Sequence, residues 1–180
     1  MSLLPKREDY TFEDWLEMDN NEKIDLIDGV LYMRGEPSRR HQKVLRQLVL
    51  KLGNFLDGKI CELYFDPFMV KLNKKIVVHP DISVICDKDK LDDKGCNGAP
   101  ELIVEILSPS NMVADVWTKY NKYLMAGVKE YWIVDPVKNE VDVYILEDDE
   151  YHGTKYSQKD ILAVTTLPGC EIDLSVIFAK

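Results

Sequence analysis

Two acidic side chains lie in segments that otherwise have the character of buried strands. Asp81 follows a proline in Val-Val-His-Pro-Asp-Ile-Ser-Val, and Glu105 lies inside the apolar run Leu-Ile-Val-Glu-Ile-Leu. Because side chains alternate between the two faces of a strand, Glu105 shares its face with Ile103 and Leu107, positions that would normally be buried. Burying an ionised carboxylate costs on the order of several kcal/mol unless a partner or a metal compensates. Two such acids on neighbouring strands therefore predict a site for a divalent cation.

Each acid also has a structural interpretation. Glu105 could be an acid at the exposed edge of a strand, and Asp81 alone could serve in a turn or a cap. Together they favour metal chemistry, because a hard cation prefers carboxylate oxygens and keeps several waters. One such water can become a nucleophile while the metal neutralises negative charge on the group that is attacked.

The segments around these acids predict a mixed sheet. The strand 101–108, the helix 112–127 and the strand 129–135 follow one another, which implies a parallel strand pair with a right-handed crossover. Earlier, 62–72 and 76–86 are two runs that suggest an antiparallel pair. The fold class predicted is α/β (α+β), a mixed β-sheet flanked by helices. The other predicted elements are a short helix over 11–18 capped by Thr11, a hairpin over 24–34 turning at Asp28-Gly29, a long helix opened by Ser38 and stopped by Asp57-Gly58, an exposed loop over 87–99, a strand over 141–146 and short strands after Tyr151.

Composition sets the broad class of the protein. The 180 residues suit one domain spanning 1–180, and 46% hydrophobic with 31% charged residues is ordinary globular composition. No apolar stretch is long enough to cross a bilayer and the N-terminus lacks a signal-like segment, so we expect a cytoplasmic protein. Four cysteines without CxxC spacing favour reduced thiols packed as small hydrophobes over a disulfide framework or a zinc site.

Charge argues against indiscriminate binding to nucleic acid but leaves one local exception. The net charge is −9, and affinity for nucleic acid comes mainly from neutralising phosphates with Lys and Arg. Between Pro37 and Leu56, however, the chain has no acid. The basic residues there are Arg39, Arg40, Lys43, Arg46 and Lys51.

Taken together, these pieces resemble the PD-(D/E)XK nuclease superfamily and, within it, a large bacterial family of restriction-endonuclease-like proteins of mostly unknown role. The resemblance covers about residues 10 to 175 and depends on the order and spacing of the motifs. The matching motifs are Ile-Asp-Leu-Ile-Asp-Gly at 24–29, Pro37-Ser38 with His41 and Gln42, Pro80-Asp81, the run 100–110, and 127–136. The resemblance implies metal-dependent cleavage of phosphodiester bonds, with Asp81 and Glu105 as ligands of Mg²⁺, or alternatively Mn²⁺.

The chain departs from the parent motif where Leu107 replaces the usual lysine. In the resembling family a lysine on the following helix is thought to substitute, in a pattern that here is Asp115, Lys119 and Tyr123. At about 100° per residue, Lys119 falls on the border of the apolar face of that helix and can reach inward, whereas Lys122 should be solvated. The alternative is that Asp115 and Lys119 form an ordinary i, i+4 ion pair.

Further candidates for the site are less specific. His41 lies in line with the apolar stripe of the long helix, so it is either a core histidine or a residue that orients a phosphate or a water. Asp25, where the family usually has a glutamate, is either a third acid of the site or a strand-edge acid facing solvent. Glu130 and Asp135 are structural ends of a strand or an outer shell of the site.

Three functions therefore compete. The leading hypothesis is a Mg²⁺-dependent endonuclease acting on nucleic acid, DNA in first place, with Arg39, Arg40, Lys43 and Arg46 guiding the backbone without reading sequence. A homodimer would supply two active sites for two strands, by family analogy. The second is a non-catalytic nuclease-fold module acting in binding or regulation, and the third a hydrolase of a non-nucleic substrate, which would leave the basic helix unexplained.

Overall fold

The main sheet carries the two acidic segments. The computed structural model describes residues 9–18, 21–108 and 113–179, and the side chains in these ranges other than those of residues 22 and 113–115. Within them, the main sheet has the order β11-β10-β9-β8-β6-β3. Its strands are β3 (Glu62–Phe65), β6 (Ile82–Ile85), β8 (Leu102–Ile106), β9 (Glu130–Asp135), β10 (Glu140–Glu147) and β11 (Glu150–Ser157). The β8–β9 pair is parallel and the other neighbours are antiparallel, so the predicted mixed sheet is confirmed.

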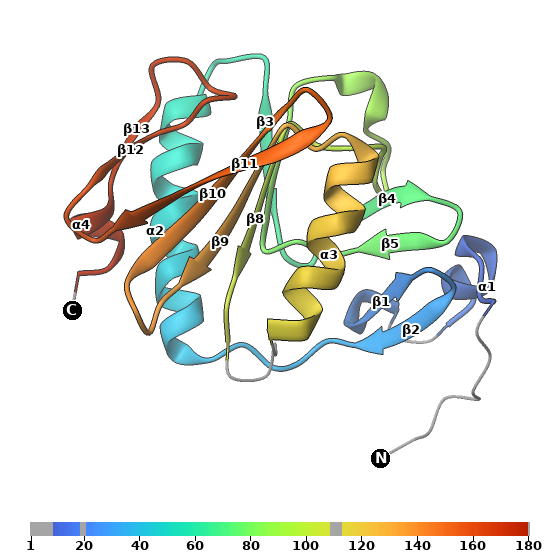
Figure 1. Ribbon diagram of the computed structural model, residues 1–180. Coiled ribbons are helices and arrows are strands. Elements are labelled where there is room, and N and C mark those ends of the chain that lie inside the picture. Colours follow the sequence, from blue (N-terminus) through green and yellow to red (C-terminus); the bar gives the residue numbers. More distant parts are fainter. Residues whose placement is uncertain (1–8, 19–20, 109–112, 180) are drawn as a thin grey trace.

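Two helices cover the two faces of this sheet (Figure 1). α2 (Arg39–Leu56) packs Leu48 and Leu52 against one face, and α3 (Val113–Ala126) packs Val116 and Tyr123 against the other. Ser38 caps α2 by accepting a hydrogen bond from the backbone N–H of His41 at 3.1 Å. Since Ile103 belongs to the α3 side and Val104 and Ile106 to the α2 side, Glu105 faces α3, as strand alternation predicted.

A second sheet packs beside the first and holds the N-terminal hairpin. Its order is β2-β1-β5-β4-β7. The strands are β1 (Ile24–Ile27), β2 (Val30–Met33), β4 (Met69–Asn73), β5 (Ile76–Val78) and β7 (Gly95–Asn97). Asp28 and Gly29 both have positive φ, which is the turn that joins β1 to β2 as predicted. Tyr10 and Trp15, from the segment around α1 (Phe12–Leu16), are buried against this sheet.

The predicted long hairpin from 62 to 86 is wrong in one respect. Each of its two runs is divided between the sheets, since β3 and β6 pair in the main sheet and β4 and β5 in the second. The divisions fall at Pro67 and Pro80, where proline has no N–H to donate to a ladder. The predicted loop 87–99 also contains β7, whose Cys96 is fully buried and which pairs in parallel with β4.

The C-terminal segment packs against α2. β12 (Ile161–Ala163), β13 (Glu171–Asp173) and α4 (Leu174–Ile177) contribute Leu162, Ile172 and Leu174 to the core on that face. β11 is longer than the weak pattern after Tyr151 predicted, and it pairs with β10 along its whole length. Among the described residues, none of the helices has both the length and the apolar character that crossing a membrane requires.

The prediction of reduced thiols is wrong for one pair of cysteines. Cys61 and Cys86 form a disulfide with a Cα–Cα distance of 3.9 Å. They lie one step beyond the Glu62–Ile85 pair of β3 and β6, so the antiparallel register brings them opposite each other. Spacing along the chain carries no trace of this, because the two residues are 25 positions apart. Cys96 and Cys170 are buried free thiols.

Candidate active site

Asp81 and Glu105 lie side by side at a pocket between the two sheets. The register of β6 and β8 pairs Ile82 with Val104, and its next step brings Asp81 opposite Glu105. Asp81 Oδ2 accepts a 2.6 Å hydrogen bond from the backbone N–H of Ile106, which fixes this carboxylate against β8. Both acids are only 5% exposed, so the exposed-edge interpretation of Glu105 is excluded. They line a narrow pocket of about 70 Å³.

His41 reaches the pocket from the first turn of α2. Its Nε2 lies 3.0 Å from Asp81 Oδ1, and its Nδ1 is buried without a hydrogen-bond partner among the described residues. Burial lowers the pKa of His41, but the hydrogen bond and charge of Asp81, together with the charges of Glu105 and Asp66, outweigh burial and raise the pKa of the imidazole above its ordinary value. The histidine is therefore bound to a site acid through its side chain rather than to backbone alone.

Lys119 enters the same pocket from α3. Its Nζ lies 3.0 Å from Asp25 Oδ2 and 3.2 Å from Glu105 Oε1, and the side chain is buried, in agreement with the orientation that helical spacing predicted. Tyr123, one turn later, donates a 2.6 Å hydrogen bond to the same Glu105 oxygen. The predicted partner Asp115 has a side chain outside the described residues. Lys122 was expected to be solvated, but it pairs with Asp28 at 2.6 Å and is only 18% exposed.

The pKa values of the two acids beside Lys119 are shifted in opposite directions. Burial raises the pKa of Glu105 to about 7, with Asp81 adding to the rise, while Lys119 and Tyr123 offset only part of it. For Asp25, burial also raises the pKa, but the charge of Lys119 and the contacts of His79 prevail and bring the pKa down to about 2. Asp25 is therefore a fixed anion near neutral pH, whereas Glu105 titrates there.

Among the pocket residues that the analysis of the sequence missed, His79, Arg34 and Asp66 form a connected group with Asp25. His79 donates its backbone N–H to Asp25 Oδ1 at 3.1 Å and places its Nδ1 at the same distance from that oxygen. The Arg34 Nε lies 3.8 Å from Asp25 Oδ1, and its guanidinium also pairs with Asp66. Asp25 is thus buried among cations rather than facing solvent. His79 is a polar residue in an apolar run, the signal that singled out Glu105, so this signal could have found it.

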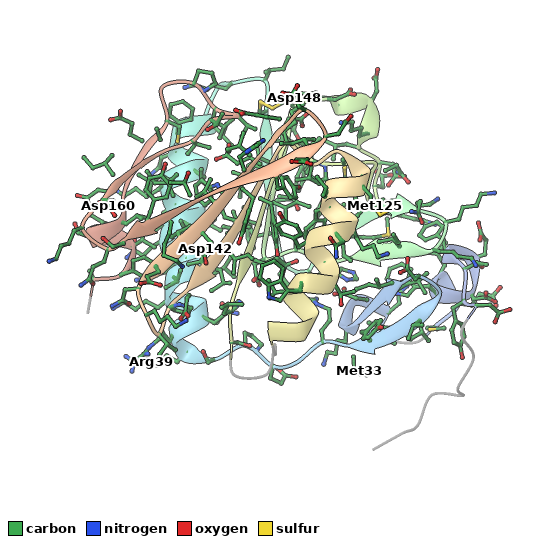
Figure 2. The ribbon with its side chains drawn as sticks, in the orientation of Figure 1. Met33, Arg39, Met125, Asp142, Asp148 and Asp160 are labelled. Atoms are coloured by element: carbon green, nitrogen blue, oxygen red, sulfur yellow. A yellow bond between two sulfur atoms is a disulfide. The ribbon has the colours of Figure 1, made fainter. Side chains whose placement is uncertain are left out.

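The basic residues of α2 do not enter this pocket. Arg39, Arg40 and Lys43 line a separate groove of about 430 Å³ together with the C-terminal segment, where Lys43 Nζ donates to the Ala179 carbonyl at 2.6 Å. Arg46 is exposed on the same helix. Figure 2 shows Arg39 at the start of α2 and Met33 at the end of β2, both along the lower edge of the molecule. The structure therefore brings together Asp25, His41, Asp81, Glu105 and Lys119, and places the predicted backbone-binding residues outside that group.

The two remaining acids have structural contacts. Glu130 is fully buried and accepts hydrogen bonds from Trp132 Nε1 at 2.8 Å and from the backbone of Thr166 at 2.7 Å. Asp135 Oδ1 accepts from the backbone N–H of Val137 and so fixes the turn after β9. Neither belongs to the pocket lining, which agrees with their interpretation as strand ends.

Comparison with known proteins assigns this architecture to a family. Residues 9–175 match the model of Uma2, a family described as "Putative restriction endonuclease". The chain belongs to the Uma2 family. This confirms the resemblance stated from the motifs, and the Uma2 match includes every residue of the pocket described above.

This Uma2 chain is similar in sequence to one further protein and in fold to one solved structure. It is 28% identical over 177 residues to "Uncharacterized protein slr1290" of Synechocystis sp., covering 97% of this chain and 92% of that protein. Its fold is similar to a crystal structure titled as a putative nuclease belonging to DUF820 from Anabaena variabilis, with a TM-score of 0.82 and 18% identity over 94% of this chain and 98% of that one. The second likeness shows the nuclease-like fold of the Uma2 chain and nothing finer.

The side chains of the pocket fit a magnesium site in which the protein supplies only some of the ligands and the substrate and waters supply the others. Among the described residues, no cluster of three or more His, Cys, Asp and Glu is arranged as a metal cage. Mg²⁺ commonly needs only one or two carboxylates, with waters and substrate phosphates supplying the other oxygens. Asp81 and Glu105 provide such a pair, and in this Uma2 pocket they lie next to the ammonium group of Lys119.

Proposed function

We propose that this protein is a Mg²⁺-dependent endonuclease that hydrolyses phosphodiester bonds of nucleic acid, with DNA as its substrate. The observation that carries the proposal is the convergence of two buried carboxylates, Asp81 and Glu105, with a buried ammonium 3.2 Å from Glu105. Structural ion pairs seldom bury two acids side by side, because their mutual repulsion adds to the cost of desolvation. Membership of the Uma2 family supports the same reaction class.

In this proposal each pocket residue has a stated role. Asp81 and Glu105 hold Mg²⁺, which when bound supplies charge neutralisation at the phosphate and a more acidic water. Lys119 donates to the attacked phosphate or positions the water, and Asp25, 3.0 Å away on its other side, holds it in place. Asp25, which contacts His79 and Arg34, is then the third acid of the site, and its role is to position Lys119.

His41 acts on the opposite side of the metal acids. Its raised pKa favours the imidazolium form, which can donate to a phosphate oxygen as well as to Asp81. The unpartnered Nδ1 leaves one ring nitrogen available for a water or a substrate oxygen. We therefore assign His41 the orientation of phosphate or water.

Guidance of the nucleic-acid backbone falls to the first half of α2. Arg39, Arg40, Lys43 and Arg46 lie on the outer side of the helix whose inner side carries His41, so phosphates bound there would run past the pocket rather than into it. The whole chain has a net charge of −9 even with these four cations included, so the rest of the protein is acidic and would confine binding to this strip. Binding through these residues should weaken steeply with salt.

A cleavage assay on closed circular substrates tests the proposal. Purified protein with Mg²⁺ or Mn²⁺ should nick a supercoiled plasmid and a single-stranded circle, since only internal cleavage can open a molecule without ends. Asp81→Asn and Glu105→Gln should each lower the rate by at least about a hundredfold, a typical cost of removing one electrostatic group from a hydrolytic site. Asp142→Asn, the same chemical change on β10, should leave the rate unchanged. Size measurement of the same samples tests the homodimer.

One observation favours the second candidate, a non-catalytic module acting in binding or regulation. Both Asp81 oxygens and one Glu105 oxygen already have hydrogen-bond or ion-pair partners within the protein, so these three oxygens are occupied without a metal. Two results together would establish that alternative and refute the nuclease proposal. The protein would bind nucleic acid but cleave neither plasmid, single-stranded DNA nor RNA with Mg²⁺ or Mn²⁺, and Asp81→Asn would leave the affinity for Mn²⁺ unchanged.

A further inference from the structure

Tyr32 occupies the rim of the pocket on an edge strand. In the β1–β2 ladder it lies directly opposite Asp25, and paired residues of an antiparallel ladder project on the same face. Its ring therefore lies beside the acid that holds Lys119, and it lines the pocket together with Asp81 and Glu105. Because β2 is an outer strand of its sheet, nothing in that sheet covers this position from the far side.

The exposure of Tyr32 is unusual for its surroundings. The side chain is 43% exposed, and its neighbour Met33 is 66% exposed, whereas Asp25 across the ladder is almost completely buried. Within the described part of the chain, Tyr32 has no hydrogen bond, ion pair or ring contact. Single exposed apolar residues are common on protein surfaces. An unpartnered aromatic ring that borders a pocket of buried charges is, by contrast, placed to contact whatever enters that pocket.

The dimensions of the pocket restrict what can enter. About 70 Å³ offers space for a few water-sized groups, such as a phosphate and its solvent, but not for a nucleoside. A phosphate that reaches the recessed acids must leave its adjoining bases outside, at the rim. There, the flat π-face of a base can stack on Tyr32 only if the base is not already stacked within a duplex.

We propose that Tyr32 is a base-stacking residue and that the protein acts on single-stranded or locally unpaired nucleic acid next to the attacked phosphate. This inference rests on the nuclease function proposed above and adds its substrate class. Arg34, two residues after Tyr32 and just beyond the end of β2, lines the same pocket, with its Nε 3.8 Å from Asp25 Oδ1. A strand stacked on Tyr32 would thus have a cation beside its phosphate.

Equilibrium binding by the full chain tests the proposal without interference from cleavage. Fluorescence anisotropy is measured in the Glu105→Gln background with an oligothymidylate, a blunt duplex of the same length, and that duplex with an unpaired tail. The variants are Tyr32→Ala, Tyr32→Leu, which keeps apolar bulk, and Tyr32→Phe, which keeps the ring. Trp117→Ala is the matched control, because Trp117 is a similarly exposed aromatic, at 51%, that does not line the pocket.

The expected result is selective for unpaired bases. Tyr32→Ala and Tyr32→Leu should weaken binding of the oligothymidylate and of the tailed duplex by about tenfold, whereas Tyr32→Phe and Trp117→Ala should keep it. Affinity for the blunt duplex should be the same in all variants. Equal loss for single strand and duplex, or no loss with either Ala or Leu, overturns the role of Tyr32 while leaving the nuclease proposal standing. No binding of any nucleic acid by the parent protein overturns both.

Discussion

Replacing Glu105 by glutamine should make the stability of the protein less sensitive to pH. Burial raises the pKa of this carboxyl from an ordinary 4.5 to about 7, and Lys119 and Tyr123 offset only part of the rise. Each pKa unit corresponds to about 1.4 kcal/mol, so ionising Glu105 in the folded protein costs about 3 kcal/mol relative to the unfolded chain. Glutamine has nearly the same shape and carries no charge, so the variant avoids this cost.

The sign of the effect follows from proton binding. Between about pH 4.5 and pH 7 the folded state holds the proton on Glu105 more tightly than the unfolded state does, so the stability is complete below this window and falls as the pH rises through it. His41, whose pKa is also raised, loses its contribution in the same direction, but it does so in both proteins. The difference between wild type and Glu105→Gln therefore reports the ionisation of Glu105, together with the part of the His41 pKa shift that the Glu105 charge causes.

Urea unfolding at about pH 5 and about pH 8 measures this difference. The wild type should lose about 2.5 kcal/mol more of its free energy of unfolding than Glu105→Gln between the two conditions, slightly less than the full effect because the carboxyl of the unfolded chain is already mostly ionised at the lower pH. Glu147→Gln, an exposed Glu at the end of β10, should behave as the wild type. Parallel pH dependence in wild type and Glu105→Gln would refute the conclusion that Glu105 is a strained, functionally retained acid.

Other perturbations test the supporting structure. Lys119→Met should abolish cleavage and lower the free energy of unfolding by about 3 to 5 kcal/mol, because it removes the ammonium partner that the buried Asp25 and Glu105 share. A stable and active variant would contradict this. Cys61→Ser should lower the free energy of unfolding by about 3 kcal/mol under oxidising conditions, because it removes a cross-link between residues 25 positions apart, and should not change it in reductant. Equal stability of the wild type with and without reductant would show that the disulfide does not form. Gly95→Ala should lower the unfolding temperature, because a Cβ there would lie 2.3 Å from the Met69 carbonyl oxygen. Gly53→Ala, in open space on α2, should not lower it.

Local periodicity explains which parts of the architecture were predictable. The alternation of residues around Glu105 predicted which face of its strand carries the carboxylate. The Asp28-Gly29 pair predicted the turn of the first hairpin, where both residues have positive φ. Periodicity could not show that the chain changes sheets twice between 62 and 86, because a strand has the same alternation whichever sheet it joins. Pro67 and Pro80 mark the changes, but a proline signals the end of a ladder and not the next partner.

The same distinction applies to the pocket. Lys119 was predictable because its place on α3 depends only on helical spacing, and Asp81 because it adjoins β6. The contact of Asp25 with His79 joins residues 54 positions apart through the pairing of β1 with β5 in the second sheet. Its contact with Lys119, 94 positions away, forms only because the second sheet docks beside α3 and the main sheet. The prediction for Lys122 failed for a similar reason, since its partner Asp28 comes from the β1–β2 turn of that sheet.

The central claim, that Asp81 and Glu105 hold one cation next to Lys119, is tested most directly by anomalous diffraction from crystals containing Mn²⁺. The account predicts an anomalous peak in the pocket with one oxygen of Asp81 and one of Glu105 at about 2 Å, the separation expected for a hard divalent ion. A pocket without a peak at saturating Mn²⁺, with Lys119 still paired to Glu105, would contradict it.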